Sequence, residues 1–261
     1  MRSNQELHRL IVCSDIRKNI LITLNHKAKS LGDLRDELNI SSTTAIHALR
    51  ELEKNRLTFQ DTNKNYALTN IGTIVALKLL DFNDAIEVMK KHESFWIEHD
   101  LTGIPEHMME KIGWLKGSTL IEDTSTDIFK VHTNFIKLLT NAREIKGVSS
   151  IFVPEYFNLF QDLIINKKVD VELILTKDVV DKLDESTLNK IFEDETLKLK
   201  LYITKQNTKA AFTVTDYFVS MGLFHSNGTY DYNRDLVSYD KKGIEWGRGL
   251  FEWYLQQSEK I

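Results

Sequence analysis

The sequence has one cysteine, Cys13, and only two prolines among its 261 residues. A single cysteine excludes an intrachain disulfide and favours a protein of the reducing cytoplasm. Cys13 lies in a short apolar run, so we expect it to be a small core residue. No apolar run approaches the roughly 20 residues of a membrane-spanning helix, and the N-terminus has no signal-peptide core. We therefore expect a cytoplasmic protein with no membrane partner.

Glycine-rich and nucleophile motifs are absent as well. The sequence contains no G-x-x-x-x-G-K, G-x-G-x-x-G or G-x-S-x-G, so the common nucleotide-binding and hydrolase classes have no support. His92, His99 and His107 are spaced seven and eight residues apart, which matches no compact zinc pattern. We predict no catalytic residue, no cofactor and no metal site, and hence not an enzyme.

Charge is present in quantity but unevenly distributed. The net charge is −4, and 28% of the residues are charged against 42% that are hydrophobic, as in ordinary globular proteins. The first 75 residues hold 11 basic and 8 acidic side chains, whereas the remainder hold 23 and 30. A basic N-terminal part on an acidic body suits attraction to phosphates at one end of the chain.

Three helical patterns and a hairpin follow one another near the N-terminus. Apolar residues recur every three or four positions from residue 15 to 25, from Ser30 onward, and from Ser41 to 55. Ser30 with Asp33 predicts a capping box, and Ser41 predicts an N-cap. Two β-like runs, 57–60 and 66–68, flank a turn-rich segment. This order of elements is a winged helix-turn-helix.

The third helix is expected to have one face for the core and one for DNA. Ala45, Leu49 and Leu52 fall on one side, and a polar stripe falls opposite. In that stripe Arg50 could form a forked contact with guanine, and the hydroxyls at the helix start suit phosphates. An ordinary solvated helix face is the alternative. The predicted DNA-binding residues are Ser41, Ser42, Thr43, Thr44, His47, Arg50 and Lys54, with Asn63, Lys64 and Asn65 at the hairpin tip.

A long helix and an α/β region make up the rest of the chain. From residue 69 to 91 a stripe recurs at helical spacing and could be a dimer seam or could pack on its own domain: Ile71, Val75, Phe82, Ile86 and Met89. Beyond residue 118, strands and helices alternate, which predicts a mostly parallel sheet covered by helices. The fold class is therefore α+β overall: a winged helix-turn-helix (1–70), a helical linker or dimerisation segment (71–118) and an α/β sensor or regulatory domain (119–261).

Several motifs resemble known regulators. The runs 39–43 and 49–53 look like archaeal winged-helix regulators of the arsenic-repressor type. The stretch from Phe95 to Pro105, together with 222–224 and 230–232, resembles the methanogenesis regulatory family of methanogenic archaea. The resemblance covers essentially the whole chain and implies a transcription regulator with a C-terminal regulatory domain. It supplies no catalytic residues.

The hairpin from Lys209 to Gly222 resembles the signature hairpin of the phospholipase D superfamily, in which His-x-Lys, four residues and Asp precede a glycine-containing strand. With Asp216 on the motif aspartate, Lys209 replaces the nucleophilic histidine and Ala211 replaces the lysine. Without that histidine and lysine the phosphodiester chemistry has no nucleophile. The resemblance implies a shared, non-catalytic fold.

The sequence thus predicts a homodimeric regulator that binds double-stranded operator DNA. Ligands of parallel sheets gather at the carboxyl ends of strands, which places a small effector near Phe152, Tyr156, Thr176 and Lys177. Because Lys177 is cationic, a polar or anionic metabolite is expected. The alternative is the same DNA-binding head with a C-terminal protein-interaction module and no small ligand; an enzyme is a third hypothesis.

Overall fold

The computed structural model describes residues 4–205 and 208–261, which divide into two compact units. The first unit ends at Asp84 and the second begins at Ala85. Each unit has a hydrophobic core of its own. In the described part of the chain, no helix has both the length and the apolar character required to cross a membrane.

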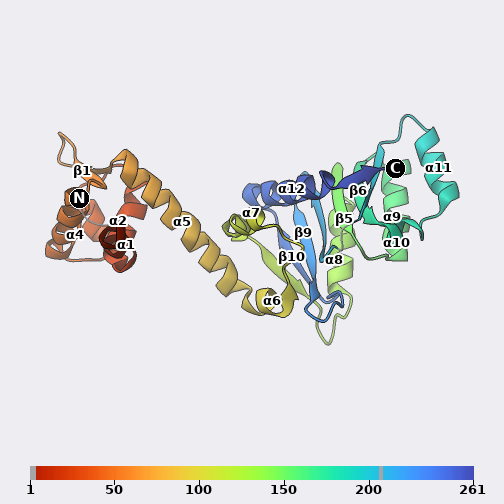
Figure 1. Ribbon diagram of the computed structural model, residues 1–261, viewed down its shortest axis with the longest axis horizontal. Coiled ribbons are helices and arrows are strands. Elements are labelled where there is room, and N and C mark those ends of the chain that lie inside the picture. Colours follow the sequence, from red (N-terminus) through yellow and green to blue (C-terminus); the bar gives the residue numbers. More distant parts are fainter. Residues whose placement is uncertain (1–3, 206–207) are drawn as a thin grey trace. The chain divides into compact units, whose positions relative to one another are not determined.

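The first unit consists of helices, a small hairpin and the larger part of a long helix, whose residues from Ala85 on belong to the second unit (Figure 1). β1 and β2 pair antiparallel, with Thr58 opposite Leu68. The elements are α1 (Asn4–Val12), α2 (Asp15–Leu24), α3 (Leu31–Leu38), α4 (Ser42–Lys54), β1 (Thr58–Gln60), β2 (Tyr66–Leu68) and α5 (Asn70–Lys91). This is the predicted winged helix-turn-helix.

Side-chain caps fix where these helices begin. The Ser30 hydroxyl accepts the Asp33 N–H at 3.1 Å and the Asp33 carboxylate accepts the Ser30 N–H at 3.0 Å, which confirms the capping box. Ser41 accepts the Thr44 N–H at 3.1 Å and so caps α4 as predicted. Between them Asn39 ends α3 in the left-handed conformation, with φ of 50°. Asparagine tolerates that conformation better than most residues, so a tight turn joins α3 to α4.

The first core unites α1, α2, α3, α4 and the start of α5. Ile20, Leu21, Leu34 and Leu52 are completely or almost completely buried in it. The helix α1, which was not predicted, contributes Leu10 and Ile11. The prediction for Cys13 was wrong, because this residue follows the last turn of α1 and is exposed.

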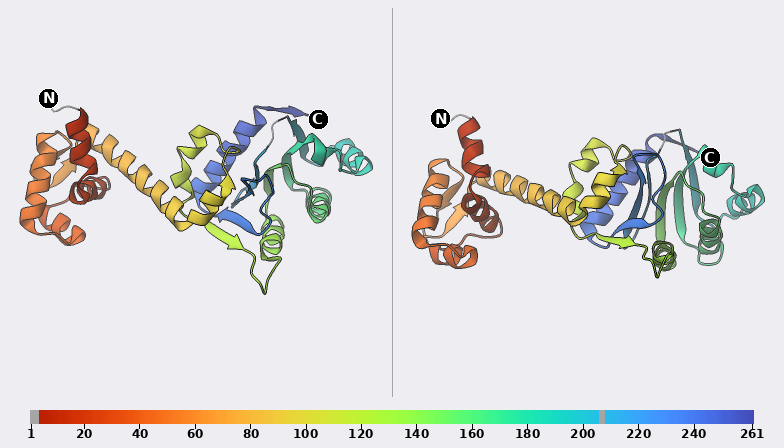
Figure 2. Two further views of the ribbon diagram at one scale, coloured as in Figure 1. Left: turned by 60° about the horizontal axis from the view of Figure 1, so that its bottom comes forward. Right: turned by 90° about the horizontal axis from the view of Figure 1, so that it is seen from below.

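The second unit is a sheet with helices on both faces (Figure 2). The helical elements are α6 (Glu93–Glu98), α7 (Glu106–Met109), a 3-10 turn η1 (Ile112–Leu115), α8 (Lys130–Leu139), α9 (Pro154–Ile165), α10 (Lys177–Val180), α11 (Glu185–Glu193) and α12 (Lys241–Leu255). The strands are β3 (His99–Asp100), β4 (Thr119–Glu122), β5 (Glu144–Ser149), β6 (Asp170–Thr176), β7 (Leu199–Thr204), β8 (Ala210–Thr215), β9 (Val219–His225), β10 (Arg234–Ser238) and β11 (Ser258–Lys260).

The strand order is β11-β7-β6-β5-β8-β9-β10-β4, with β3 paired to β9. Only β5 with β6 and β6 with β7 are parallel among the pairs of described strands. The α+β class is confirmed, but the expectation of a mostly parallel sheet is wrong. Strands and helices alternate only as far as β7; β8, β9 and β10 then follow one another without helices, and such connections give antiparallel pairs.

The segment between α5 and β4 packs into the second unit, although it was expected to be part of a linker. Phe95, Ile104, Met108 and Leu115 are buried in the same core as the sheet residues and α12. The Trp246 indole N–H donates to the Met108 carbonyl at 2.9 Å. This core covers one face of the sheet, and α8 and α9 cover the other with a second cluster.

Candidate nucleic-acid interface and candidate ligand site

The helix α4 has the two faces that the sequence predicted. Ala45, Ala48, Leu49 and Leu52 are buried. The polar stripe opposite them is exposed along its whole length, and it comprises Thr43, His47, Arg50 and Lys54. None of these four side chains packs in the core, so all of them are accessible to a binding partner.

The hydroxyl residues at the start of α4 divide into two groups. Ser42 is exposed, whereas the hydroxyls of Ser41 and Thr44 lie 2.8 Å apart and Thr44 is half-buried. Ser41 also accepts the Thr44 N–H. The capping contacts therefore occupy Ser41 and Thr44, and Ser42 is the more accessible hydroxyl.

The hairpin tip is shaped by Asp61. Its carboxylate accepts the N–H groups of Asn63 at 2.9 Å and Asn65 at 2.8 Å. Lys64 has a positive φ of 61°, and both Asn63 and Lys64 are exposed, whereas Asn65 is half-buried. The tip therefore presents a lysine outward from a turn that is ordered by its own hydrogen bonds.

The second unit contains a cavity of about 160 Å³ between the sheet and the helices α8 and α9. Its walls are largely aromatic and aliphatic, and they include residues at the carboxyl end of β5. The lining residues include Phe135, Phe152, Tyr156, Phe157 and Phe160 from the helical side and Gly147, Leu173, Ala211, Thr213, Ser220 and Asp235 from the sheet.

Two of the four predicted ligand-binding residues line this cavity. Phe152 and Tyr156 belong to it, whereas Thr176 and Lys177 are not among its lining residues. Thr176 is the N-cap residue of α10 and Lys177 is exposed. The cavity includes the expected strand end, since Ser149, Phe152 and Val153 line it at the carboxyl end of β5, and it extends from there over the small residues Gly147 and Ala211.

Asp235, on β10, is the acidic residue of the cavity, and sequence analysis missed it. It is 7% exposed, and burial raises the pKa of its carboxyl to about 7 although the Ser220 hydroxyl and the Met221 N–H donate to it. Tyr156 donates or accepts a hydrogen bond with His132 at 3.1 Å; burial raises the pKa of the Tyr156 phenol. The sequence contains one signal that could have pointed to Asp235, namely an acidic residue inside the run 234–238, which forms β10.

The hairpin that resembles phospholipase D has structural roles. The Asp216 carboxylate accepts the backbone N–H of Arg143 at 3.0 Å. The Lys209 ammonium lies over the ring of Phe224, 5.9 Å from its centroid. Ala211 pairs with Gly222 and lines the cavity. The positions of the motif histidine and lysine are thus occupied by Lys209, which contacts an aromatic ring, and Ala211, which has no polar side chain.

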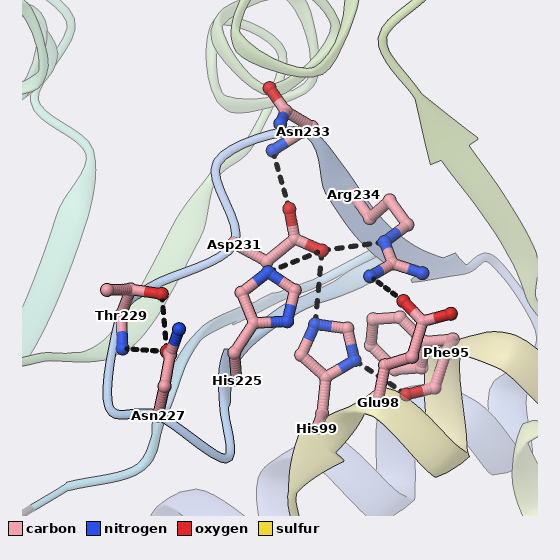
Figure 3. A network of polar contacts seen from close by, with 9 residues as sticks. All are labelled: Phe95, Glu98, His99, His225, Asn227, Thr229, Asp231, Asn233 and Arg234. Carbon is pink, nitrogen blue, oxygen red and sulfur yellow. Dashed lines mark hydrogen bonds and ion pairs between the residues drawn. The ribbon is translucent and has the colours of Figure 1, made fainter.

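The three histidines singled out in the sequence lie in separate environments and do not form one cluster. His92 lies 3.1 Å from the Ser118 hydroxyl, and burial lowers its pKa; His107 is exposed. His99 meets Asp231, with 3.1 Å between Nε2 and Oδ2, and stacks on His225 (Figure 3).

The carboxylate of Asp231 is the centre of this polar network. Arg234 Nε donates to its Oδ2 at 2.6 Å, and a second guanidinium nitrogen donates to Glu98 at 2.7 Å. His225 Nε2 is 3.7 Å from the same Oδ2. Burial alone would raise the pKa of Asp231, but hydrogen bonds from His99, Arg234 and the Asn233 N–H hold it well below its usual range. Since Arg234 already neutralises the shared oxygen, the network is suited to holding β3 against β9.

A winged-helix unit joined to a sheet unit with an internal cavity defines a two-part protein of the winged-helix class. Residues 5–87 match the N-terminal domain of the methanogenesis regulatory protein FilR1, and residues 128–257 match its middle domain. The chain belongs to this family. A curated relative, the methanogenesis regulatory protein FilR1 of Methanothrix harundinacea, is 24% identical over 258 residues. That alignment covers 97% of this chain but 57% of the relative.

Solved structures show more distant similarity. The archaeal chromatin protein TrmBL2 is 14% identical, with a TM-score of 0.45, and 92% of each chain is covered. NucT from Helicobacter pylori is 14% identical, with a TM-score of 0.41, covering 55% of this chain and 98% of NucT. The phospholipase D family member Nuc from Salmonella typhimurium is 10% identical, with a TM-score of 0.40, covering 55% of this chain and 97% of Nuc.

Proposed function

We propose that this protein is a DNA-binding transcription regulator. The observation that carries the proposal is the exposed stripe Thr43, His47, Arg50 and Lys54 on α4. A helix of this kind can enter the major groove and read base edges through its polar side chains. Lys64 would meet phosphates beside the helix. Family membership agrees with this role, and the second unit then supplies the regulation.

Replacing Arg50 by alanine should weaken binding to the cognate site by about 1–3 kcal/mol and relax one base preference. Lys64→Ala should weaken all duplexes similarly and flatten the salt dependence, because a phosphate contact carries no sequence information. The operator is first selected from genomic DNA, and both variants are then titrated at several salt concentrations.

Lys241→Ala is the matched control, since this lysine is 91% exposed on the second unit. It should bind DNA like the parent. If the Arg50 and Lys64 variants also bind like the parent, α4 does not read DNA.

We propose further that the protein acts as a homodimer through α5. A single winged helix contacts too few base pairs to specify a unique site in a genome, and a two-fold dimer doubles the length of the recognised sequence. The large exposed apolar side chains of this helix are 48–63% exposed, and they are Ile71, Ile74, Leu77, Phe82 and Met89. The seam differs from the predicted stripe, since Val75 packs on the first core and Ile86 is half-buried.

Substituting aspartate at both Ile71 and Phe82 should yield a folded monomer that has lost most of its operator affinity. In the dimer, the introduced aspartates of one chain would face those of the other across a desolvated interface, and this repulsion between like charges is strongly unfavourable. Sedimentation velocity measures the assembly, and Ile97→Asp serves as control because Ile97 is 72% exposed on α6. A parent chain that is monomeric at micromolar concentration contradicts the proposal.

The third part of the proposal is that the second unit senses a small molecule in its cavity. Pockets of this kind, apolar with a few converging polar groups, are the usual sites for small ligands. A ligand that binds there changes operator affinity only if it binds the two functional states unequally. The test is operator titration with and without the ligand.

A further inference from the structure

The cavity exists because the sheet carries small residues where it faces α8 and α9. Gly147, Thr213 and Ser220 lie side by side on β5, β8 and β9. In the next row Ala211 pairs with Gly222. A Cβ atom at residue 222 would lie 2.0 Å from the Tyr230 hydroxyl, so glycine lets that phenol reach over the strand. The phenol of Tyr230 covers residue 222, and the small residues Gly147, Ala211 and Ser220 leave the remaining space above these strands open.

The size of this space limits what can occupy it. At about 160 Å³ it is close to the roughly 150 Å³ of an apolar cavity that accepts benzene. Phe135, Phe157 and Phe160 on the helical side favour a flat or aliphatic body. A sugar or a nucleotide would leave most of its hydroxyl groups without partners against these apolar walls.

The charges of the cavity-lining residues determine which polar group a bound ligand can carry. The cavity lining contains one acidic residue, Asp235, and among the described lining residues there is no lysine, arginine or histidine. The groups that donate to Asp235 are the Ser220 hydroxyl and the Met221 N–H, both neutral. An anionic ligand would meet a carboxylate with no compensating cation, so the anionic metabolite expected from Lys177 is disfavoured.

The remaining titratable groups near Asp235 do not supply a positive charge to it. Tyr156 and Tyr230 line the cavity, and burial raises the pKa of both phenols, which keeps them neutral. His132 lies behind Tyr156, hydrogen-bonded to its hydroxyl. Burial holds the pKa of Asp235 at about 7, so the carboxylate form is reached near neutral pH but has no cationic partner.

We propose that the cavity binds a compact apolar amine, whose protonated nitrogen donates to Asp235 while its body fills the space between Phe135, Phe157 and Phe160. This inference rests on the proposed sensing role and names its ligand class. The ammonium supplies the cation that the buried carboxylate lacks, and charge-assisted hydrogen bonds of this kind are stronger than neutral ones. Binding should therefore strengthen as the pH rises through 7.

The test is calorimetric titration of the full chain with three probes of one shape: benzylamine, benzyl alcohol and benzoate. We expect benzylamine to bind best and benzoate not to bind. Asp235→Asn should weaken benzylamine binding about tenfold or more while changing benzyl alcohol binding little, because the loss is that of a charged hydrogen bond. Ala211→Leu, which fills the cavity, should abolish binding of every probe, and circular dichroism checks its fold.

Two results overturn the inference. Equal affinity for benzylamine and benzoate, or benzylamine binding that is unchanged in Asp235→Asn, excludes Asp235 as the recognition group. Absence of binding by all three probes to the parent chain excludes a compact amine in this cavity. Operator titration by the same protein tests DNA binding separately, so failure here is distinguishable from failure of the proposed function.

Discussion

Asp235→Asn should raise the free energy of unfolding of the second unit at pH 8, by up to about 4 kcal/mol. In the folded state burial raises the pKa of this carboxyl from 3.8 to about 7. The folded protein therefore holds a proton that the unfolded chain releases between about pH 4 and 7, and stability falls as pH rises through that window. Asparagine keeps the shape but cannot ionise, so the difference between variant and parent should be small at pH 4 and largest above pH 7.

Urea unfolding followed by tryptophan fluorescence measures this difference. All four tryptophans, residues 96, 114, 246 and 253, belong to the second unit, so the signal reports that unit alone. Asp178→Asn, an exposed aspartate on α10, is the control and should change stability little at any pH. A parent and an Asp235→Asn variant with parallel pH profiles would show that Asp235 is ionised in the folded state at low pH as well.

Asp231→Ala should lower the free energy of unfolding of the second unit by about 3–5 kcal/mol. The substitution removes the carboxylate of a buried ion pair and leaves the Arg234 guanidinium without that counter-charge. The Asp231 side chain is 3% exposed and accepts from His99 and Arg234. Its folded pKa is depressed, so its contribution is present above the unfolded pKa of about 3.9 and declines as pH falls below that value.

The matched control is Glu98→Ala, which removes the other partner of Arg234. Glu98 is 51% exposed, and an exposed pair contributes less than about 1 kcal/mol. Both variants are unfolded by urea at pH 7 and at about pH 3, where part of the contribution of Asp231 should be lost. If Asp231→Ala costs no more than Glu98→Ala at pH 7, the network in Figure 3 does not stabilise β3 against β9.

The first unit was predictable because its signals are local. Caps such as Ser30 and Ser41 act over three residues, and the polar and apolar faces of α4 follow from helical period. The helix α1 was missed because its apolar residues, Leu10 and Ile11, meet the turn at Ser14 almost at once. Whether the exposed stripe reads DNA stays a prediction from sequence and structure alike.

The second unit was predictable in its elements but less so in its pairing. Alternation identified β6 and α9, whereas β10 was missed because Arg234 and Asp235 open a run that does not look like a buried strand. Its position beside β9 makes Asp235 part of the cavity. Partners far apart in sequence, such as His99 and Asp231, cannot be read from local pattern, since the sheet topology determines which residues meet.

The pairing of β4 with β10 has a consequence for synthesis on the ribosome. Glu122, which ends β4, is opposite Arg234, so β4 has no strand partner until more than a hundred further residues have been made. At roughly 5–20 residues per second this takes on the order of ten seconds. The first unit, complete at Asp84, can fold during that interval, while Leu120 and Ile121 remain uncovered. Until β10 has been made, the nascent second unit therefore exposes apolar side chains that the folded unit covers.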